Sequence, residues 1–169
     1  MEISLGKLKL INIHFLGEVN NPGVIPVHPF STVTTGLIQA GGISNVGSLR
    51  DIKIIREGKT ITSIDYYQYF KNGDILDNIQ LQNNDVISIP IKNSEIEIEG
   101  MVTQPGIFEL KKDETLGDLI YFAGGLRFNA DNKANIKRIL PIEYRINEKN
   151  IFQNILVVLP SDNNTKLMN

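Results

Sequence analysis

Apolar and polar residues alternate along the first strand-sized stretch of the chain. Ile11, Ile13 and Phe15 are separated by Asn12 and His14, and this period of two predicts a half-buried strand. The next residues, 20–23, read Asn-Asn-Pro-Gly, which suits a type II turn because Pro restricts φ and Gly accepts a positive φ. An apolar run at 24–27 then predicts the returning strand of a hairpin.

A helix is predicted directly after this hairpin. Ser31-Thr32 supply an N-cap, and Val33, Leu37 and Ala40 recur at helical spacing, which gives one apolar face. We expect the helix to end at Gly41-Gly42, because glycine takes a left-handed conformation after a helix at little cost.

The rest of the first ~90 residues completes an α+β pattern. We predict strands at 52–56 and 60–64, a short helix from 65 to 70 closed by Asn72-Gly73, and a last strand at 86–91. A mixed sheet around one main helix is the β-grasp, or ubiquitin-like, arrangement.

The sequence contains an internal repeat. Residues 17–23 recur at 100–106 (100 − 17 = 83), and 40–43 recur at 123–126 (123 − 40 = 83). We therefore predict two tandem β-grasp modules, at 1–93 and 94–160, followed by a disordered polar tail at 161–169. The shared turn residues form the repeated structural motif: Gly17, Pro22, Gly23, Gly41 and Gly42, matched by Gly100, Pro105, Gly106, Gly124 and Gly125.

The second module shows the same signals more loosely. Thr115 is the predicted helix N-cap, Asp118 completes a capping box, and Leu116, Ile120 and Ala123 form the buried face. A first strand is expected around Ile96 and Ile98. The remaining strands are expected at 136–139, through Pro141, Tyr144, Ile146 and Ile151, and at 155–159.

Composition excludes several classes of function. The net charge is −2 (17 basic and 19 acidic residues), which argues against a nucleic-acid-binding domain. Without cysteine there is no disulfide, thiolate catalysis, iron–sulfur cluster or cysteine-bound zinc. No apolar run reaches the ~18–20 residues that span a bilayer, so no direct membrane insertion is expected. The first residues do not resemble a secretion signal, which leaves a cytoplasmic protein or a piece of a longer exported protein, and we expect the second.

Taken together, the ordered motifs resemble the soluble-ligand-binding β-grasp (SLBB) domain, in the version found in bacterial outer-membrane polysaccharide export proteins. The residues that carry the resemblance are Gly17-Glu18-Val19-x-x-Pro22-Gly23, Ser31-Thr32, Ala40-Gly41-Gly42, Gly47-Ser48-Leu49-Arg50-x-Ile52, Arg56-x-Gly58, Asn72-Gly73-Asp74, Leu81-Gln82-x-x-Asp85-Val86-Ile87 and Ile89-Pro90. The family usually has Gly at position 84, where this chain has Asn, a residue that a left-handed turn tolerates.

The resemblance implies a periplasmic location, as part of an outer-membrane-associated export channel for capsular polysaccharide or exopolysaccharide. It also implies three partners: copies of the chain in the ring of the full-length protein, an inner-membrane polysaccharide copolymerase, and the polysaccharide itself, bound weakly. It implies no cofactor. Pore formation is not carried over to these residues, because the chain contains neither a lipidation cysteine nor the family's membrane helix.

Catalytic candidates are few, and we predict that the chain is not an enzyme. His14 and His28 fall on neighbouring predicted strands but have no obvious acidic partner, and Ser31 and Ser44 have no evident base. The carboxylates of Glu95, Glu97 and Glu99 share one strand face, which fits a solvated face or, alternatively, a calcium site.

The binding candidates lie in turns and on aromatic residues. Asn20, Asn21 and Gln104 offer amides suited to sugar hydroxyls, although Asn is also common in turns for its backbone conformation. Tyr66 and Tyr67, with Tyr69 nearby, offer rings for stacking on sugars, although part of this set must face the core if the segment is helical. Two alternatives stay open: a pocket enzyme, and a soluble-ligand or DNA-uptake receptor module of another pathway.

Overall fold

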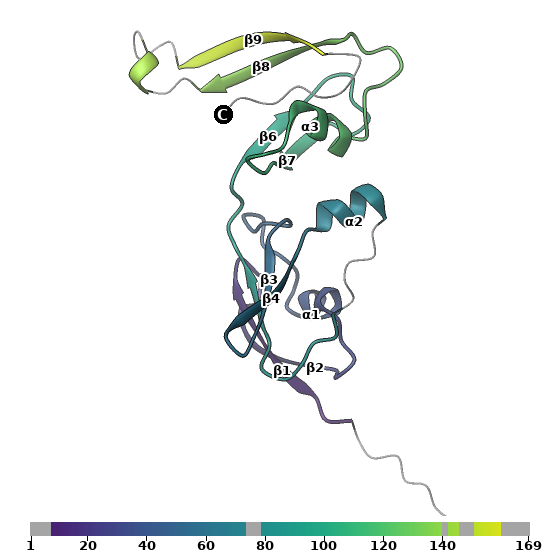
Figure 1. The fold of residues 1–169 in the computed structure, drawn as a ribbon, viewed down its shortest axis with the longest axis vertical. Coiled ribbons are helices and arrows are strands. Elements are labelled where there is room, and N and C mark those ends of the chain that lie inside the picture. The colour runs from purple at the N-terminus through teal and green to yellow at the C-terminus, as the bar shows by residue number, and fades with distance from the viewer. Residues whose placement is uncertain (1–7, 74–78, 140–141, 146–150, 160–169) are drawn as a thin grey trace, which may run out of the picture. The chain divides into compact units, whose positions relative to one another are not determined.

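The computed structural model describes residues 8–73, 79–139, 142–145 and 151–159 (Figure 1). The chain divides into two compact units, unit 1 at 1–95 and unit 2 at 96–169. The tail expected at 161–169 lies outside the described residues. Among the described residues, no helix has the length and apolar character needed to cross a membrane.

Unit 1 contains one five-stranded mixed sheet with the strand order β2-β1-β5-β3-β4. The central strand β5 runs parallel to β1 and antiparallel to β3, so it joins the two hairpins. This sheet with its main helix α1 confirms the predicted β-grasp fold. The elements are β1 (Ile11–Gly17), β2 (Gly23–Val27), α1 (Val33–Gln39), β3 (Ile52–Arg56), β4 (Lys59–Ile64), α2 (Tyr66–Asn72) and β5 (Val86–Ile89).

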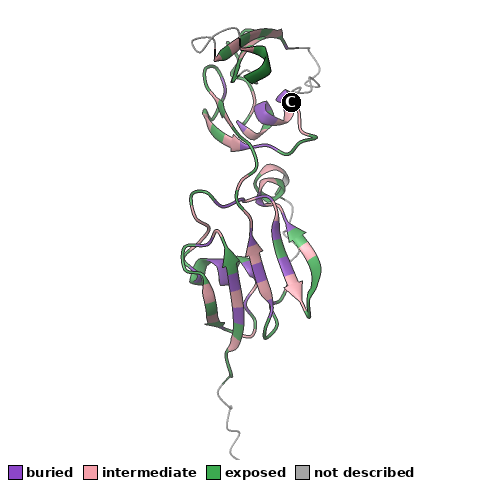
Figure 2. Cartoon of the chain, turned by 90° about the vertical axis from the view of Figure 1, so that its left-hand side faces the viewer, coloured by how far each residue is buried: buried purple, intermediate pink, exposed green. Residues whose placement is uncertain are grey.

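The core of unit 1 lies between the sheet and α1. Alternate residues of the strands are buried, which produces the purple bands in Figure 2. Ile13 and Phe15 of β1 are fully buried, and Val33 and Leu37 of α1 belong to the same cluster. A Cβ added to Gly36 would lie 3.1 Å from the Phe15 ring, so the absence of a side chain there lets α1 approach the sheet closely.

The helix ends follow the local signals. Thr32 and Thr35 form the capping box of α1, and Gly41 and Gly42 follow the helix with φ of 80° and 83°. Asp65 caps α2, and Gly73 closes it in a left-handed conformation. Asn84 also has a positive φ, 69°, as expected for a residue that replaces glycine in a left-handed turn.

Two boundaries differ from the prediction. The turn expected at 20–23 is part of a loop that both begins and ends earlier. Strand β2 already begins at Gly23, which pairs with Phe15. The loop starts after Gly17 and includes Val19, which is buried in the core and forms a bridge with Ile43. Strand β5 ends at Ile89, two residues early. Pro90 has no N–H to continue the ladder, and Ile91 forms only an isolated bridge with Gly47.

Within its described residues, unit 2 repeats the opening hairpin and the main helix of unit 1 but not the single sheet. Its described strands form two separate two-stranded sheets, β6-β7 and β8-β9. Both sheets contribute side chains to one apolar cluster around α3, including Ile96, Phe108, Ile136 and Val157. The elements are β6 (Glu95–Ile98), β7 (Gly106–Glu109), α3 (Leu116–Phe122), β8 (Lys133–Ile139), the 3-10 helix η1 (Ile142–Tyr144) and β9 (Phe152–Val158).

The expected strand path through Tyr144 is therefore wrong. Ile142 and Tyr144 are 79% and 69% exposed, so no burial holds this segment extended, and the preceding Pro141 in the sequence favours the first turn of a helix. Among the described strands of the second module, β9 pairs with β8 and no pairing to β6 is described, so these strands form two small sheets within the α+β fold. Pro141 and Ile146 themselves lie outside the described residues.

Candidate functional site

Each module contains one Pro-Gly corner, which we define as the loop after the first strand together with the loop after the main helix. In unit 1 these loops are 17–23 and 40–44, and in unit 2 they are 100–106 and 123–127. The bridge Val19↔Ile43 holds the first corner together, and Val102↔Leu126 holds the second. The offset is 83 at both bridge positions (102 − 19 and 126 − 43), so the repeat in sequence is a repeat in structure.

The backbone hydrogen bonds of the two corners also correspond one to one. In unit 1 they are Asn20 N to Gly42 O at 3.0 Å, Asn21 N to Ala40 O at 3.0 Å and Ser44 N to Glu18 O at 2.9 Å. In unit 2 they are Thr103 N to Gly125 O at 3.0 Å, Gln104 N to Ala123 O at 2.8 Å and Arg127 N to Met101 O at 2.9 Å. Because all six are backbone bonds, the corner keeps its shape while its side chains differ.

At three corner positions glycine is favoured both by a positive φ and by close packing. Gly17 has a φ of 79°, and a Cβ there would lie 2.0 Å from the Ile89 carbonyl oxygen. Gly41 has a φ of 80°, and its missing side chain leaves room for the Asn21 amide. The counterpart Gly124 has a φ of 77° and lies against the Thr103 side chain.

The three amide candidates are exposed, but they differ in the hydrogen bonds that their side chains make within the protein. Asn20 Nδ2 donates a hydrogen bond to the Gly41 carbonyl at 2.7 Å, so this amide helps to hold the corner. Asn21 and Gln104 make no side-chain hydrogen bond to described residues and are exposed to solvent. They occupy equivalent positions (104 − 21 = 83), so each corner presents one amide that is available to a ligand.

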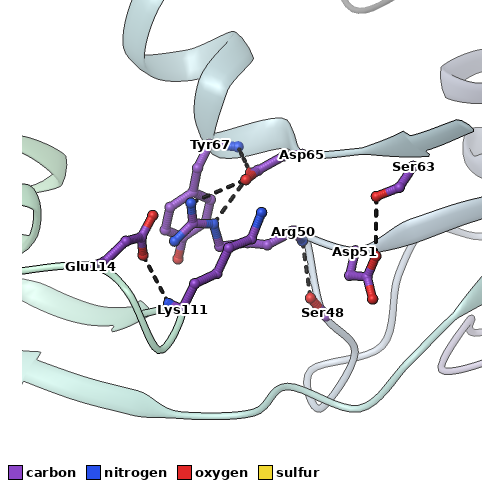
Figure 3. Close-up of polar contacts among 8 residues, drawn as sticks. All are labelled: Ser48, Arg50, Asp51, Ser63, Asp65, Tyr67, Lys111 and Glu114. Atoms are coloured by element: carbon purple, nitrogen blue, oxygen red, sulfur yellow. Dashed lines mark hydrogen bonds and ion pairs between the residues drawn. The ribbon is translucent and has the colours of Figure 1, made fainter.

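The tyrosine candidates differ in how far their side chains are buried. Tyr66 is only 8% exposed, and its hydroxyl lies 3.0 Å from Thr34 Oγ1. It is a core residue, which corrects the expectation that its ring stacks on a sugar. Burial raises the pKa of its hydroxyl, and the Thr34 hydrogen bond partly offsets that rise. Tyr67 is half-buried, and the Arg50 guanidinium lies 4.4 Å from its ring centroid, so a cation already covers one face of this ring (Figure 3).

Arg50 is the centre of a buried polar cluster that sequence reasoning missed (Figure 3). Its side chain is 1% exposed and forms a bidentate pair with Asp65, with Nη2–Oδ2 at 3.0 Å and Nε–Oδ1 at 3.2 Å. Asp65 Oδ1 also accepts the Tyr67 backbone N–H at 2.9 Å, which caps α2. The sequence signal was an arginine directly before a buried strand, in Leu49-Arg50-x-Ile52.

A second missed pair connects β3 to the start of β5. Arg56 Nε and Nη2 each lie 2.8 Å from an oxygen of Asp85, whose side chain is fully buried. The hydrogen bond to Asp85 raises the pKa of the Arg56 guanidinium, which stays charged. Both arginine pairs are satisfied within unit 1, so removing one partner would leave a buried charge uncompensated, and neither pair forms an open reactive site.

The catalytic and metal candidates are not brought together. His14 is half-buried on β1, where it pairs with Val24, whereas His28 lies beside Phe30. Ser44 Oγ donates to Glu18 Oε2 at 3.1 Å, and Glu95 forms an exposed ion pair with Lys92 at 2.8 Å. Within the described ranges, no three His, Asp or Glu side chains converge to hold a metal ion.

Comparison with known proteins agrees with this duplicated geometry. Residues 12–89 match one SLBB domain model, and residues 96–150 match a second SLBB domain model. The two matches cover one module each and together span well over half of the chain. No curated protein matches the chain. The two modules that carry the Pro-Gly corners are therefore tandem SLBB domains, and the chain belongs to the SLBB domain family.

Proposed function

We propose that this chain is the periplasmic SLBB pair of a capsular polysaccharide or exopolysaccharide export protein. The SLBB domains themselves indicate a module that binds a soluble ligand. In the proposed role the pair is not an enzyme: it assembles with other copies, contacts an inner-membrane polysaccharide copolymerase and touches the polysaccharide in transit.

The observation that carries the proposal is the pair of equivalent amides, Asn21 and Gln104, at the two corners. Each is exposed and makes no side-chain hydrogen bond to the described residues, and each sits on a backbone held by matching hydrogen bonds. A primary amide both donates and accepts, as does a sugar hydroxyl. Two such sites in one chain permit weak contacts at several points of a polymer, which suits a cargo that has to be released.

The charge distribution supports a polysaccharide over a nucleic acid. The net charge is −2, and the arginine side chains of Arg50 and Arg56 are already paired with Asp65 and Asp85. Binding to DNA depends on many phosphate contacts from exposed cations. The binding test must therefore distinguish a polysaccharide-binding module from the alternative, a receptor module for DNA uptake.

The test is a titration of the ¹⁵N-labelled chain with a panel of purified capsular polysaccharides and exopolysaccharides, followed by the side-chain amide signals. We expect the Asn21 and Gln104 signals to shift together, and the variant Asn21→Ala/Gln104→Ala to lose most of the binding. Asn93→Ala is the matched control, because Asn93 is an exposed amide outside both corners. Binding that persists in the double variant contradicts the corner as the site, and salt-sensitive binding of duplex DNA contradicts the proposed function.

A further inference from the structure

Strand β6 of unit 2 has an edge that its counterpart in unit 1 does not leave open. Strand β1 pairs with β2 on one side and with β5 on the other, where His14 N donates to Asp85 O at 2.9 Å and Asn12 O accepts from Asn84 N at 2.8 Å. The repeat places Glu97 at the position of His14 (14 + 83 = 97). Within the part of unit 2 that the structure describes, β6 pairs with β7 alone, so this edge has no partner strand.

The hairpin β8-β9 provides a second open edge in the same unit. Its counterpart β3 is flanked by both β4 and β5, whereas the described pairing of β8 is with β9 alone. Unpaired N–H and C=O groups along such an edge readily accept a further strand. Because an open edge exposes both N–H donors and C=O acceptors, two open edges can pair with each other by strand addition.

The outward side chains of the two strands are opposite in charge. On β6 and directly after it, Glu95, Glu97 and Glu99 are exposed, whereas Ile96 and Ile98 pack towards the core. On β8, the exposed residues are Lys133, Asn135 and Lys137, and the residues that pack inward are Ala134 and Ile136.

The spacing of the charges also matches. Glu95 and Glu99 are four residues apart, as are Lys133 and Lys137. If these charges are paired, Glu97 lies opposite Asn135 whether the strands run parallel or antiparallel. Opposite charges facing each other across neighbouring strands stabilise the pairing.

We infer that β6 of one copy of this chain adds to β8 of a second copy, with Glu97 opposite Asn135. This inference rests on the assembly role proposed above and names the surfaces that meet. A second copy is the fitting occupant because the chain itself supplies both the acidic edge and the basic edge, which the structure places in separate sheets. Such head-to-tail pairing leaves one edge free at each end, so it continues into a ring or a filament.

The association is expected to be weak. The strand β6 is four residues long, and exposed ion pairs contribute little. Glu95 also contacts Lys92 at 2.8 Å, Lys133 contacts Asp131 at 3.6 Å, and Lys137 lies over the Phe152 ring, so pairing exchanges these exposed contacts for new ones. A covalent trap is therefore the appropriate measurement.

Because the chain has no cysteine, the variants Glu97→Cys and Asn135→Cys each introduce a single thiol. The two variants, distinguished by tags of different mass, are mixed under mild oxidation, and the disulfide-linked products are quantified by mass spectrometry. We expect the mixed dimer to form about fivefold faster than either homodimer, in keeping with the preference of two opposite-charge pairs. Asp113→Cys, exposed elsewhere in unit 2, replaces Glu97→Cys in the control mixture, where this excess should vanish.

Two results overturn the inference: a mixed dimer no faster than the control, or a disulfide within one chain of the variant Glu97→Cys/Asn135→Cys. As a second measurement, Glu95→Lys/Glu99→Lys should abolish the excess, because both charge pairs become repulsive. If cross-linking fails while the Asn21 and Gln104 signals still shift with polysaccharide, this interface is wrong and the proposed function stands. The reverse result rejects polysaccharide binding and keeps the interface.

Discussion

Arg56 and Asp85 form a two-bond ion pair that ties the end of β3 to the residue before β5, with both N–O distances at 2.8 Å. The same carboxylate accepts the Gln82 backbone N–H at 2.8 Å. Arg56→Met leaves the Asp85 charge buried without its cation, and we expect the free energy of unfolding of unit 1 to fall by roughly 3 kcal/mol. Urea unfolding followed by the backbone amide signals of β3 measures this loss.

Lys53→Met is the matched control for that variant. Lys53 is 47% exposed and contacts Asp51 at 3.5 Å, and such a surface pair contributes less than about 1 kcal/mol. Equal losses in the two variants would mean that the buried pair adds nothing beyond an ordinary surface contact.

Gly17 is predicted to be less replaceable than Gly58, although both have a positive φ, 79° and 76°. Alanine in the left-handed region costs about 1–2 kcal/mol, and we expect Gly58→Ala to show this loss alone, since no atom lies within 4 Å of its new Cβ. Gly17→Ala adds a collision with the Ile89 carbonyl and should cost clearly more. Thermal unfolding of the two variants compares them directly, and a smaller loss for Gly17→Ala would refute the close approach of β1 to Ile89.

The buried hydroxyl of Tyr66 should make unit 1 sensitive to alkaline pH. Burial raises its pKa in the folded state above the ordinary value of 10.0, so the unfolded chain releases this proton first. The stabilisation is complete below about pH 10 and is lost as the pH rises further. Tyr66→Phe should lose about 1 kcal/mol near neutral pH with the Thr34 hydrogen bond, and its stability should decline less above about pH 10.

The measurement for this prediction is the unfolding midpoint in urea as a function of pH. Tyr69→Phe is the control for the loss of a hydroxyl, since Tyr69 is 43% exposed, and it should change stability little near neutral pH. Identical alkaline slopes for wild type and Tyr66→Phe would contradict the assignment of this hydroxyl to the core.

The equivalent helix caps should contribute equally to the two units. Thr32 and Thr115 each form a capping box, and each is the residue directly before its helix. Thr32→Ala should destabilise unit 1, and Thr115→Ala unit 2, by about 1 kcal/mol each. The unfolding of each unit, followed by its own amide signals, checks the assignment, and a variant that destabilises only the opposite unit would contradict it.

The elements that sequence predicted well are those determined by neighbouring residues. The hairpin at 11–27, the caps at Thr32 and Thr115, and the glycines after both helices depend on signals within a few residues. The repeat was visible for the same reason, since its motifs are the turns that both modules need. The turns do more than connect elements, because the buried side chains of Val19 and Val102 anchor each corner.

The features that sequence missed depend on distant contacts. Whether β9 joins β6 is decided by pairing across about 50 residues, to which local alternation gives no guide. Arg50 and Asp65 are 15 residues apart, and two charged residues would ordinarily be assigned to the surface. The tyrosines could be sorted only from the structure, because Tyr66 and Tyr69 lie on one side of α2 at a spacing of three residues, yet only Tyr66, in the first turn, packs into the core.

The double use of the Asp65 carboxylate has a consequence for how unit 1 opens. One oxygen both caps α2 and binds Arg50, while the other completes the grip on the same guanidinium. If the first turn of this helix unfolded, the buried Arg50 guanidinium would lose part of its ion pair with Asp65. Unfolding of the helix and breaking of the Arg50–Asp65 pair are therefore expected to occur together. A two-turn helix at the rim of a domain would normally fluctuate independently of the rest. This one is instead expected to exchange its amide protons only as fast as the central strands do.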